Sequence, residues 1–171
     1  MRFLNSTECA DWCEHLLPLD EHRRPTRELG YPHRLCCSFP PSFTQLLWFS
    51  RSIESALQPR EDCLLWVTDW GIFPSNENLH AYYRIRQSYG DLRLLDEAPG
   101  HFCLSYERPE VVTLIQLCIL FGWDVHLIPF AGFGRAFVSH DEYAELGFGG
   151  QAQFEETRGA FETAKLKVKV L

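Results

Sequence analysis

The chain has 171 residues, 46% of them hydrophobic and 23% charged, which is enough for one globular domain with its own core. This composition excludes a disordered chain, a collagen-like fibre and a coiled coil. The formal net charge is −7, and residues 61–146 carry 13 acidic against five basic side chains, a balance that argues against nucleic-acid binding.

Two helices and a strand are predicted in the first 60 residues. Asn5 with Glu8 forms a capping-box pattern ahead of apolar residues at helical spacing. Ser42 with Gln45 repeats that pattern before a second apolar stretch. The predicted elements are a helix that ends at Pro18, a strand over 34–39 and a helix over 43–57.

Strands and helices continue to alternate as far as residue 146. Residues 63–70 are apolar without alternation, which is typical of a strand covered on both faces. Ser139 with Glu142 forms another capping-box pattern and predicts a short helix that ends at Leu146. The remaining elements are a helix from about 76 to 89, a strand over 101–106, a helix over 110–121 that Gly122 ends, and a hairpin of 125–128 with 135–138.

Alternating strands and helices predict the fold class. Such spacing favours a single α/β domain, with a mostly parallel sheet, flanking helices and a C-terminal hairpin, over residues 1–146. Residues 147–171 are expected to form a polar tail. The three lysines of the chain alternate with apolar residues near its end, as in a terminal edge strand, and an unstructured terminus is the alternative.

The seven cysteines indicate a reducing compartment. They are too sparse for a disulfide scaffold, and several lie in apolar runs, as buried free thiols do. The first residues lack the apolar core of a signal peptide, and the apolar run 111–123 is too short to span a membrane. We therefore expect a cytoplasmic protein that is not bound to membranes.

One candidate catalytic site lies at the carboxyl ends of the predicted strands, where open α/β sheets bind ligands. If the strands are parallel neighbours, Asp69, Glu107 and His140 meet there. A histidine beside carboxylates can act as a general base. The structural alternative is that Ser139 and Glu142 account for this segment as a helix cap.

A candidate binding site follows the strand 63–70. Trp70, Tyr82 and Tyr83 can form an aromatic contact surface, although Trp70 can equally cover the core. Ser75 and Asn76 begin the next predicted helix, whose N-terminus can hold an anion.

The sequence predicts no cofactor and no metal site. It contains no glycine-rich phosphate-binding motif and no GxSxG. His101 and His126 lie in apolar strands and are expected to be core histidines. Four side chains near the start of the chain can ligate metal but lack the second ligand pair of a zinc site: Cys9, Asp11, Cys13 and His15.

Two functions remain open at this stage, and whether the protein is an enzyme is undecided. The first is a non-catalytic protein-binding domain, such as a bacterial immunity or adaptor protein, that uses an acidic, aromatic-containing surface. The alternative is a small hydrolase or transferase with Asp69, Glu107 and His140 in its site. In either case we expect a monomer or a homodimer with a protein partner or a small ligand.

Overall fold

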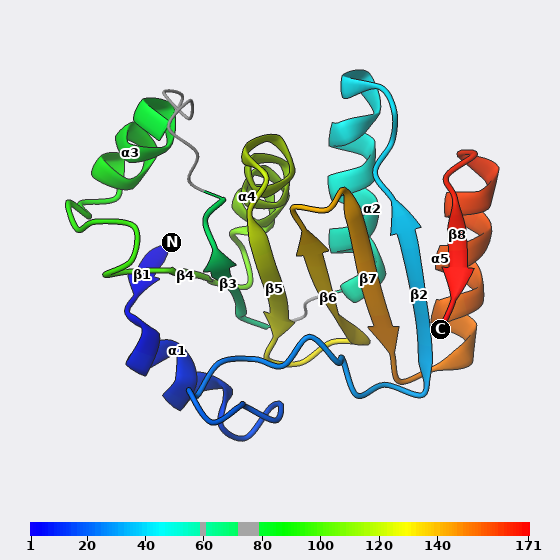
Figure 1. Ribbon diagram of the computed structural model, residues 1–171, viewed down its shortest axis with the longest axis horizontal. Coiled ribbons are helices and arrows are strands. Elements are labelled where there is room, and N and C mark those ends of the chain that lie inside the picture. The colour runs from blue at the N-terminus through cyan, green and yellow to red at the C-terminus, as the bar shows by residue number, and fades with distance from the viewer. Residues whose placement is uncertain (59–60, 72–78) are drawn as a thin grey trace.

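An eight-stranded antiparallel sheet forms the centre of the protein (Figure 1). The computed structural model describes residues 1–58, 61–71 and 79–171. Within them, the strands in sheet order are β1 (Arg2–Leu4), β4 (Gly100–Cys103), β3 (Cys63–Asp69), β5 (Asp124–Pro129), β6 (Gly134–Ser139), β7 (Tyr143–Phe148), β2 (His33–Ser38) and β8 (Val168–Val170).

The prediction of a mostly parallel sheet is wrong, because every neighbouring pair of strands is antiparallel. Two helical connections do join strands of the same direction that have one strand of opposite direction between them: β3 separates β4 from β5, and β2 separates β7 from β8. The helical connection from β3 to β4 instead joins direct antiparallel neighbours. The crossovers expected from the sequence therefore exist without producing parallel neighbours.

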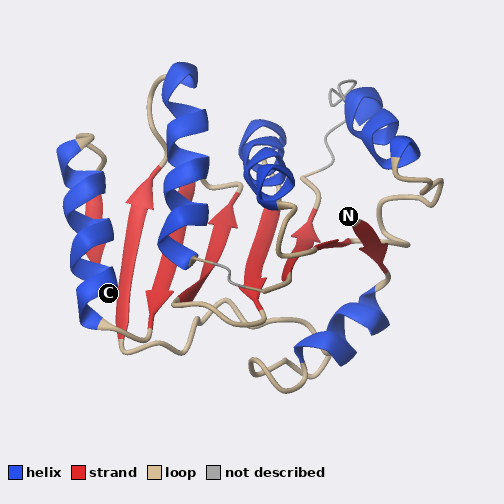
Figure 2. Ribbon diagram, turned by 180° about the vertical axis from the view of Figure 1, so that it is seen from behind, coloured by secondary structure: helices blue, strands red, loops and turns tan. Residues whose placement is uncertain are grey.

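Helices cover both faces of the sheet unequally. The helices of the described residues are α1 (Ser6–Cys13), α2 (Leu46–Leu57), α3 (Leu79–Ser88), α4 (Arg108–Phe121) and α5 (Gln151–Thr163). Figure 2 shows α2, α4 and α5 side by side on one face. The other face is covered by α1, whose Cys9 and Cys13 pack against Leu64 and Trp66 of β3.

The predicted burial of β3 on both faces is confirmed. Leu65 and Val67 belong to the main core under α2, α4 and α5, while Leu64 and Trp66 belong to the smaller core under α1. Alternate side chains of one strand therefore fill two separate cores, which explains why the apolar run shows no alternation.

Local helix signals were only partly reliable. The capping box at Asn5 and Glu8 is confirmed, since each side chain accepts a hydrogen bond from the other residue's backbone N–H. Gly122 ends α4 in the left-handed conformation, as expected. The cap predicted at Ser42 is wrong, because its hydroxyl bonds with that of Thr44 rather than with a helix N–H.

The short helix predicted over 139–146 is also wrong. The β5–β6 hairpin is confirmed, but the chain then turns and adds a third strand, β7. The Ser139 hydroxyl accepts a hydrogen bond from the N–H of Asp141 within this turn. Glu142 adopts a positive φ of 63°, so the residue that looked like part of a helix cap instead reverses the chain.

The last 25 residues pack onto the rest of the protein. Helix α5 places Phe154 and Phe161 in the main core. Strand β8 then pairs with β2 at the outer side of the sheet, where Figure 1 shows the C-terminus. All seven cysteines are free thiols, and six of them are buried, in agreement with their expected role in the core. None of the helices in the described part of the chain is long and apolar enough to cross a membrane.

Candidate functional site

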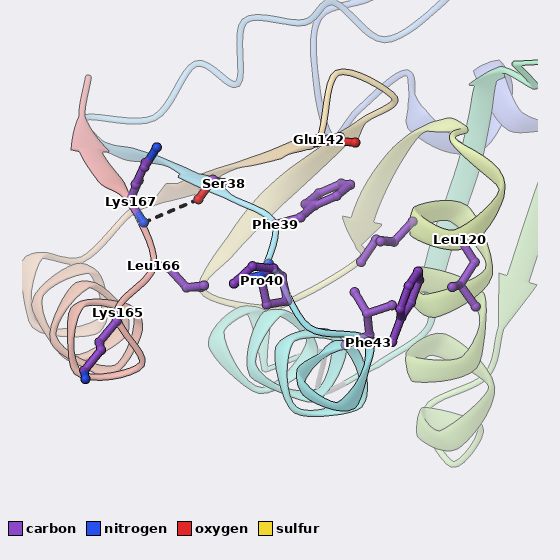
Figure 3. A pocket seen from close by; sticks show the side chains of 12 residues that line it. Ser38, Phe39, Pro40, Phe43, Leu120, Glu142, Lys165, Leu166 and Lys167 are labelled. Atoms are coloured by element: carbon purple, nitrogen blue, oxygen red, sulfur yellow. Dashed lines mark hydrogen bonds between the residues drawn. The ribbon is translucent and has the colours of Figure 1, made fainter.

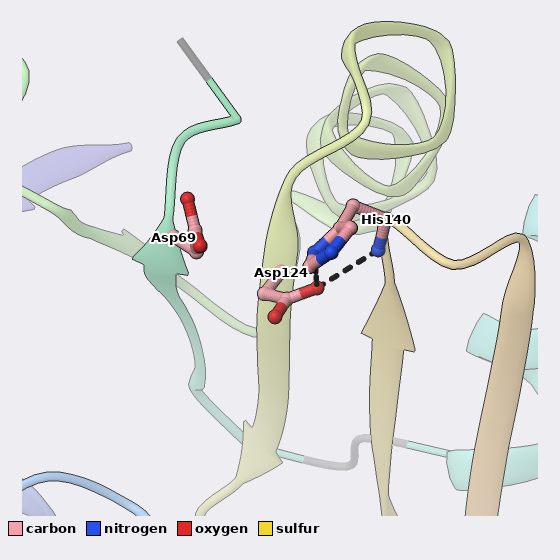
Figure 4. A group of neighbouring side chains, drawn as sticks. All are labelled: Asp69, Asp124 and His140. Atoms are coloured by element: carbon pink, nitrogen blue, oxygen red, sulfur yellow. Dashed lines mark hydrogen bonds and ion pairs between the residues drawn. The ribbon is translucent and has the colours of Figure 1, made fainter.

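Three polar side chains converge where β3 ends, β5 begins and β6 ends (Figure 4). They are Asp69, Asp124 and His140, which we call the sheet-edge cluster. One ligand atom of each residue lies within 4.8 Å of those of the other two. The three meet because neighbouring antiparallel strands bring one C-terminal end and the next N-terminal end to the same edge.

Asp124 positions His140. Its side chain is only 3% exposed. One of its oxygens, Oδ1, accepts hydrogen bonds from the backbone N–H of His140 at 2.8 Å and from His140 Nδ1 at 2.9 Å. The other, Oδ2, accepts a bond from Arg27 Nη2 at 3.1 Å. The buried carboxylate thus orients the imidazole and leaves Nε2 on the half-exposed side, 3.5 Å from Asp141.

Asp69 reaches this cluster through an irregularity in β3. The register shifts between Val67 and Asp69, which places Asp69 opposite Asp124. The N–H of Gly71 donates to Asp69 Oδ1 at 2.9 Å. Gly71 has a φ of 51°, and a Cβ there would lie 2.3 Å from the carbonyl oxygen of Gly122, so only glycine fits this turn.

Glu107 lies at the other end of the sheet. Cys103, which ends β4, pairs with Cys63 at the start of β3, whereas Asp69 ends β3. The carboxylate of Glu107 forms an ion pair with the ammonium group of Met1 and accepts the N–H of Leu104. It therefore cannot share one site with Asp69 and His140.

The aromatic residues singled out in the sequence are mostly internal. Trp70 is buried and packs edge-on against Trp123, with ring centroids 4.8 Å apart, in agreement with a role in covering the core. Tyr82 is fully buried, and its hydroxyl bonds with Nε2 of His101. Tyr83 is half-buried. Ser75 and Asn76 lie outside the described residues.

The two core histidines are confirmed. Burial lowers the pKa of His101 to about 4, and the neutral ring donates from Nδ1 to the carbonyl oxygen of Leu65. Burial, with the charge of Arg135, lowers the pKa of His126 to about 3. Its Nδ1 accepts a hydrogen bond from Arg135 Nη2 at 3.4 Å.

An apolar groove of about 600 Å³, which no sequence pattern predicted, lies between the ends of α2, α4 and α5 (Figure 3). Phe43, in the short 3-10 helix η1 (Phe43–Gln45) that precedes α2, is 81% exposed beside it, and Leu120 of α4 is also exposed. The residues that line this groove are Ser38, Phe39, Pro40, Pro41, Phe43, Leu46, Ile119, Leu120, Glu142, Lys165, Leu166 and Lys167.

The charges around the apolar groove are mainly positive. Lys165 and Lys167 are exposed, and neither forms an ion pair with another described residue. Many carboxylates of the acidic central region, by contrast, have partners within the fold. Asp91, for example, pairs with both Arg86 and Arg93. Fewer free carboxylates are therefore available to a partner than the composition indicates.

No protein-family model matches the chain, and no curated protein or solved structure is significantly similar to it. The sheet-edge cluster and the apolar groove are therefore the two features from which a function can be inferred.

Proposed function

We propose that the protein is a non-catalytic protein-binding domain that holds a segment of its partner in the apolar groove. The observation that carries this proposal is Phe43, a phenyl side chain 81% exposed at the rim of a groove with apolar walls. Exposed aromatic residues beside an apolar hollow are characteristic of the centres of protein interfaces.

The groove is built on regular elements. Phe43 immediately precedes α2, and Leu120 lies in the last turn of α4, two helices that pack against each other over the sheet. Pro40 and Pro41 restrict the backbone that leads from β2 to Phe43. Such a preformed surface loses little conformational entropy when a partner binds.

The charge of the groove indicates the partner's chemistry. Lys165 and Lys167 supply two positive charges, against one negative charge from Glu142. We therefore expect the bound segment to combine a large apolar side chain, which contacts Phe43 and Leu120, with Asp or Glu residues that approach the two lysines. This differs from the acidic contact surface that the composition favoured.

A selection from a random-peptide library displayed on phage tests the proposal. Peptides enriched on the wild-type protein should share apolar and acidic positions. Phe43→Ser should weaken their binding at least about tenfold, as expected for an interface anchor. The double variant Lys165→Glu, Lys167→Glu should abolish the preference for acidic residues.

Tyr106→Ser is the matched control, because Tyr106 is an aromatic residue 76% exposed outside the groove. The affinity of the Tyr106→Ser variant for the selected peptides should equal that of the wild-type protein. Peptides that bind Phe43→Ser and the wild type equally well, or a selection that enriches none, would overturn the proposal.

A further inference from the structure

We infer that the sheet-edge cluster binds one divalent transition-metal cation through Asp69, Asp124 and His140. This inference is independent of the apolar groove and of the partner proposed for it. It rests on the convergence of three ligand atoms, the local charge and the chemistry of the donors.

The distances require little rearrangement. Bonds from such a metal to carboxylate oxygen and imidazole nitrogen are about 2.0–2.2 Å, so two atoms bound to one ion lie at most about 4.4 Å apart. The three candidate ligand atoms already lie within 4.8 Å of one another. Small side-chain movements can close this difference. Because Nδ1 of His140 donates to Asp124 Oδ1, binding of the metal at Nδ1 requires that its proton move to Nε2, which faces Asp141 at 3.5 Å.

The local charge favours a cation. Asp69, Asp124 and Asp141 bring three carboxylates together, while Arg27 supplies the one guanidinium that pairs with them among the described residues. The three carboxylates and Arg27 together carry a formal charge of −2. Asp69 forms no ion pair with another described residue, so a bound dication would remove a repulsion between carboxylates that Arg27 compensates only in part.

Arg27 occupies the position of a counter-ion that can be displaced. Its side chain is 65% exposed, whereas the Asp124 carboxylate that it contacts is buried. A flexible, exposed arginine can swing into solvent when a dication approaches Asp124. Arg27 therefore competes with the metal. Removal of its charge should increase the affinity for the metal rather than decrease it.

Two carboxylates and one imidazole identify the class of ion. Calcium and magnesium prefer oxygen ligands alone, whereas imidazole nitrogen suits zinc, copper, iron and nickel, and carboxylate oxygen suits manganese. Three protein ligands also leave coordination positions that water can fill.

Manganese(II) is the best probe, because the seven free cysteines can bind zinc elsewhere. Free Mn²⁺ gives a six-line electron paramagnetic resonance signal that is lost when the ion binds. Chelator-treated protein titrated with MnCl₂ should bind one equivalent. Asp69→Asn should weaken this binding at least about tenfold, and His140→Asn should do the same.

Asp96→Asn is the control for the loss of one exposed carboxylate. It should leave the affinity for Mn²⁺ unchanged, whereas Arg27→Gln should increase it several-fold by removing the competing charge. Since Asp69 and Arg27 are both exposed, these variants should fold. Absence of binding up to about 1 mM Mn²⁺, or equal affinities for Asp69→Asn and Asp96→Asn, would refute the metal site.

Discussion

Acid should destabilise this protein through two buried histidines, His101 and His126. Burial is the main cause that lowers the pKa of each imidazole, from 6.5 to about 4 and about 3 respectively. The unfolded chain therefore takes up these two protons before the folded protein does as the pH falls. The corresponding stability is fully present above pH 6.5 and is lost as the pH falls from 6.5 towards the folded-state pKa values.

The size of the effect follows from the difference in bound protons. Each pH unit below 6.5 costs about 1.4 kcal/mol per histidine while the folded state stays neutral. Between pH 7.5 and 5.0, each histidine thus removes about 2 kcal/mol, and the two together remove about 4 kcal/mol. This is a large part of the 5–15 kcal/mol by which domains are usually stable.

Urea unfolding followed by tryptophan fluorescence can measure this loss, since the chain has five tryptophans. The free energy of unfolding is compared at pH 7.5 and 5.0 within each variant, so that the cost of the substitution itself cancels. His101→Gln and His126→Gln should each halve the loss to about 2 kcal/mol, and the double variant should nearly abolish it. His22→Gln, at an exposed position, should behave as the wild type.

A wild-type loss well below 2 kcal/mol would contradict the expected contribution of the two buried imidazoles. A loss in His101→Gln as large as that of the wild type would exclude His101 as its source. Glu145, whose pKa is raised chiefly by burial, acts in the opposite direction near the low end of this range and is common to all the variants.

Two further predictions concern packing and reactivity. Gly134→Ala should lower the free energy of unfolding by about 2 kcal/mol or more, because its Cβ would lie 2.0 Å from the carbonyl oxygen of Gly147 on β7. Gly149→Ala meets nothing within 4 Å, and an equal loss for both variants in thermal melts would contradict this explanation. Burial raises the pKa of all seven cysteines, including Cys36, so exposure rather than pKa distinguishes Cys36, the one thiol that is not buried. Native protein should therefore react with one equivalent of iodoacetamide, as read by mass spectrometry, and Cys36→Ser should remove this reaction.

Elements with local signals could be predicted from the sequence. The capping box at Asn5 and the left-handed Gly122 depend on residues a few positions apart, and both were recognised. The turn between β6 and β7 was missed because it places Glu142, rather than Gly or Asn, at a positive φ. Its spacing from Ser139 imitates a helix cap, so a local pattern pointed to the wrong element.

The order of the strands depends on contacts between distant segments. Nothing between β4 and β5 in the sequence shows that β3 lies between them in the sheet. The pattern of strand, helix and strand therefore identified the crossover that α4 makes between β4 and β5. It did not identify which strands lie next to β4 and β5 in the sheet. The antiparallel pairing results from the position of β3 between β4 and β5. It could not be inferred from the spacing of the elements along the chain.

The same limit applies to the sites. Asp69 and His140 were recognised as candidates, but Asp124 was missed, although a carboxylate at the start of an apolar strand was a visible signal. The apolar groove combines segments from four parts of the chain, including Phe43, Leu120, Glu142 and Lys165. No single stretch of sequence contains enough of it to suggest a surface.

The two outermost strands limit how copies of this protein can associate. Strands β1 and β8 are each three residues long, and β8 carries Lys169 between its two valines. A second copy that added a strand at either edge would gain few backbone hydrogen bonds, and at β8 it would also bring lysines together. Growth into a continuous intermolecular sheet is therefore disfavoured at both edges.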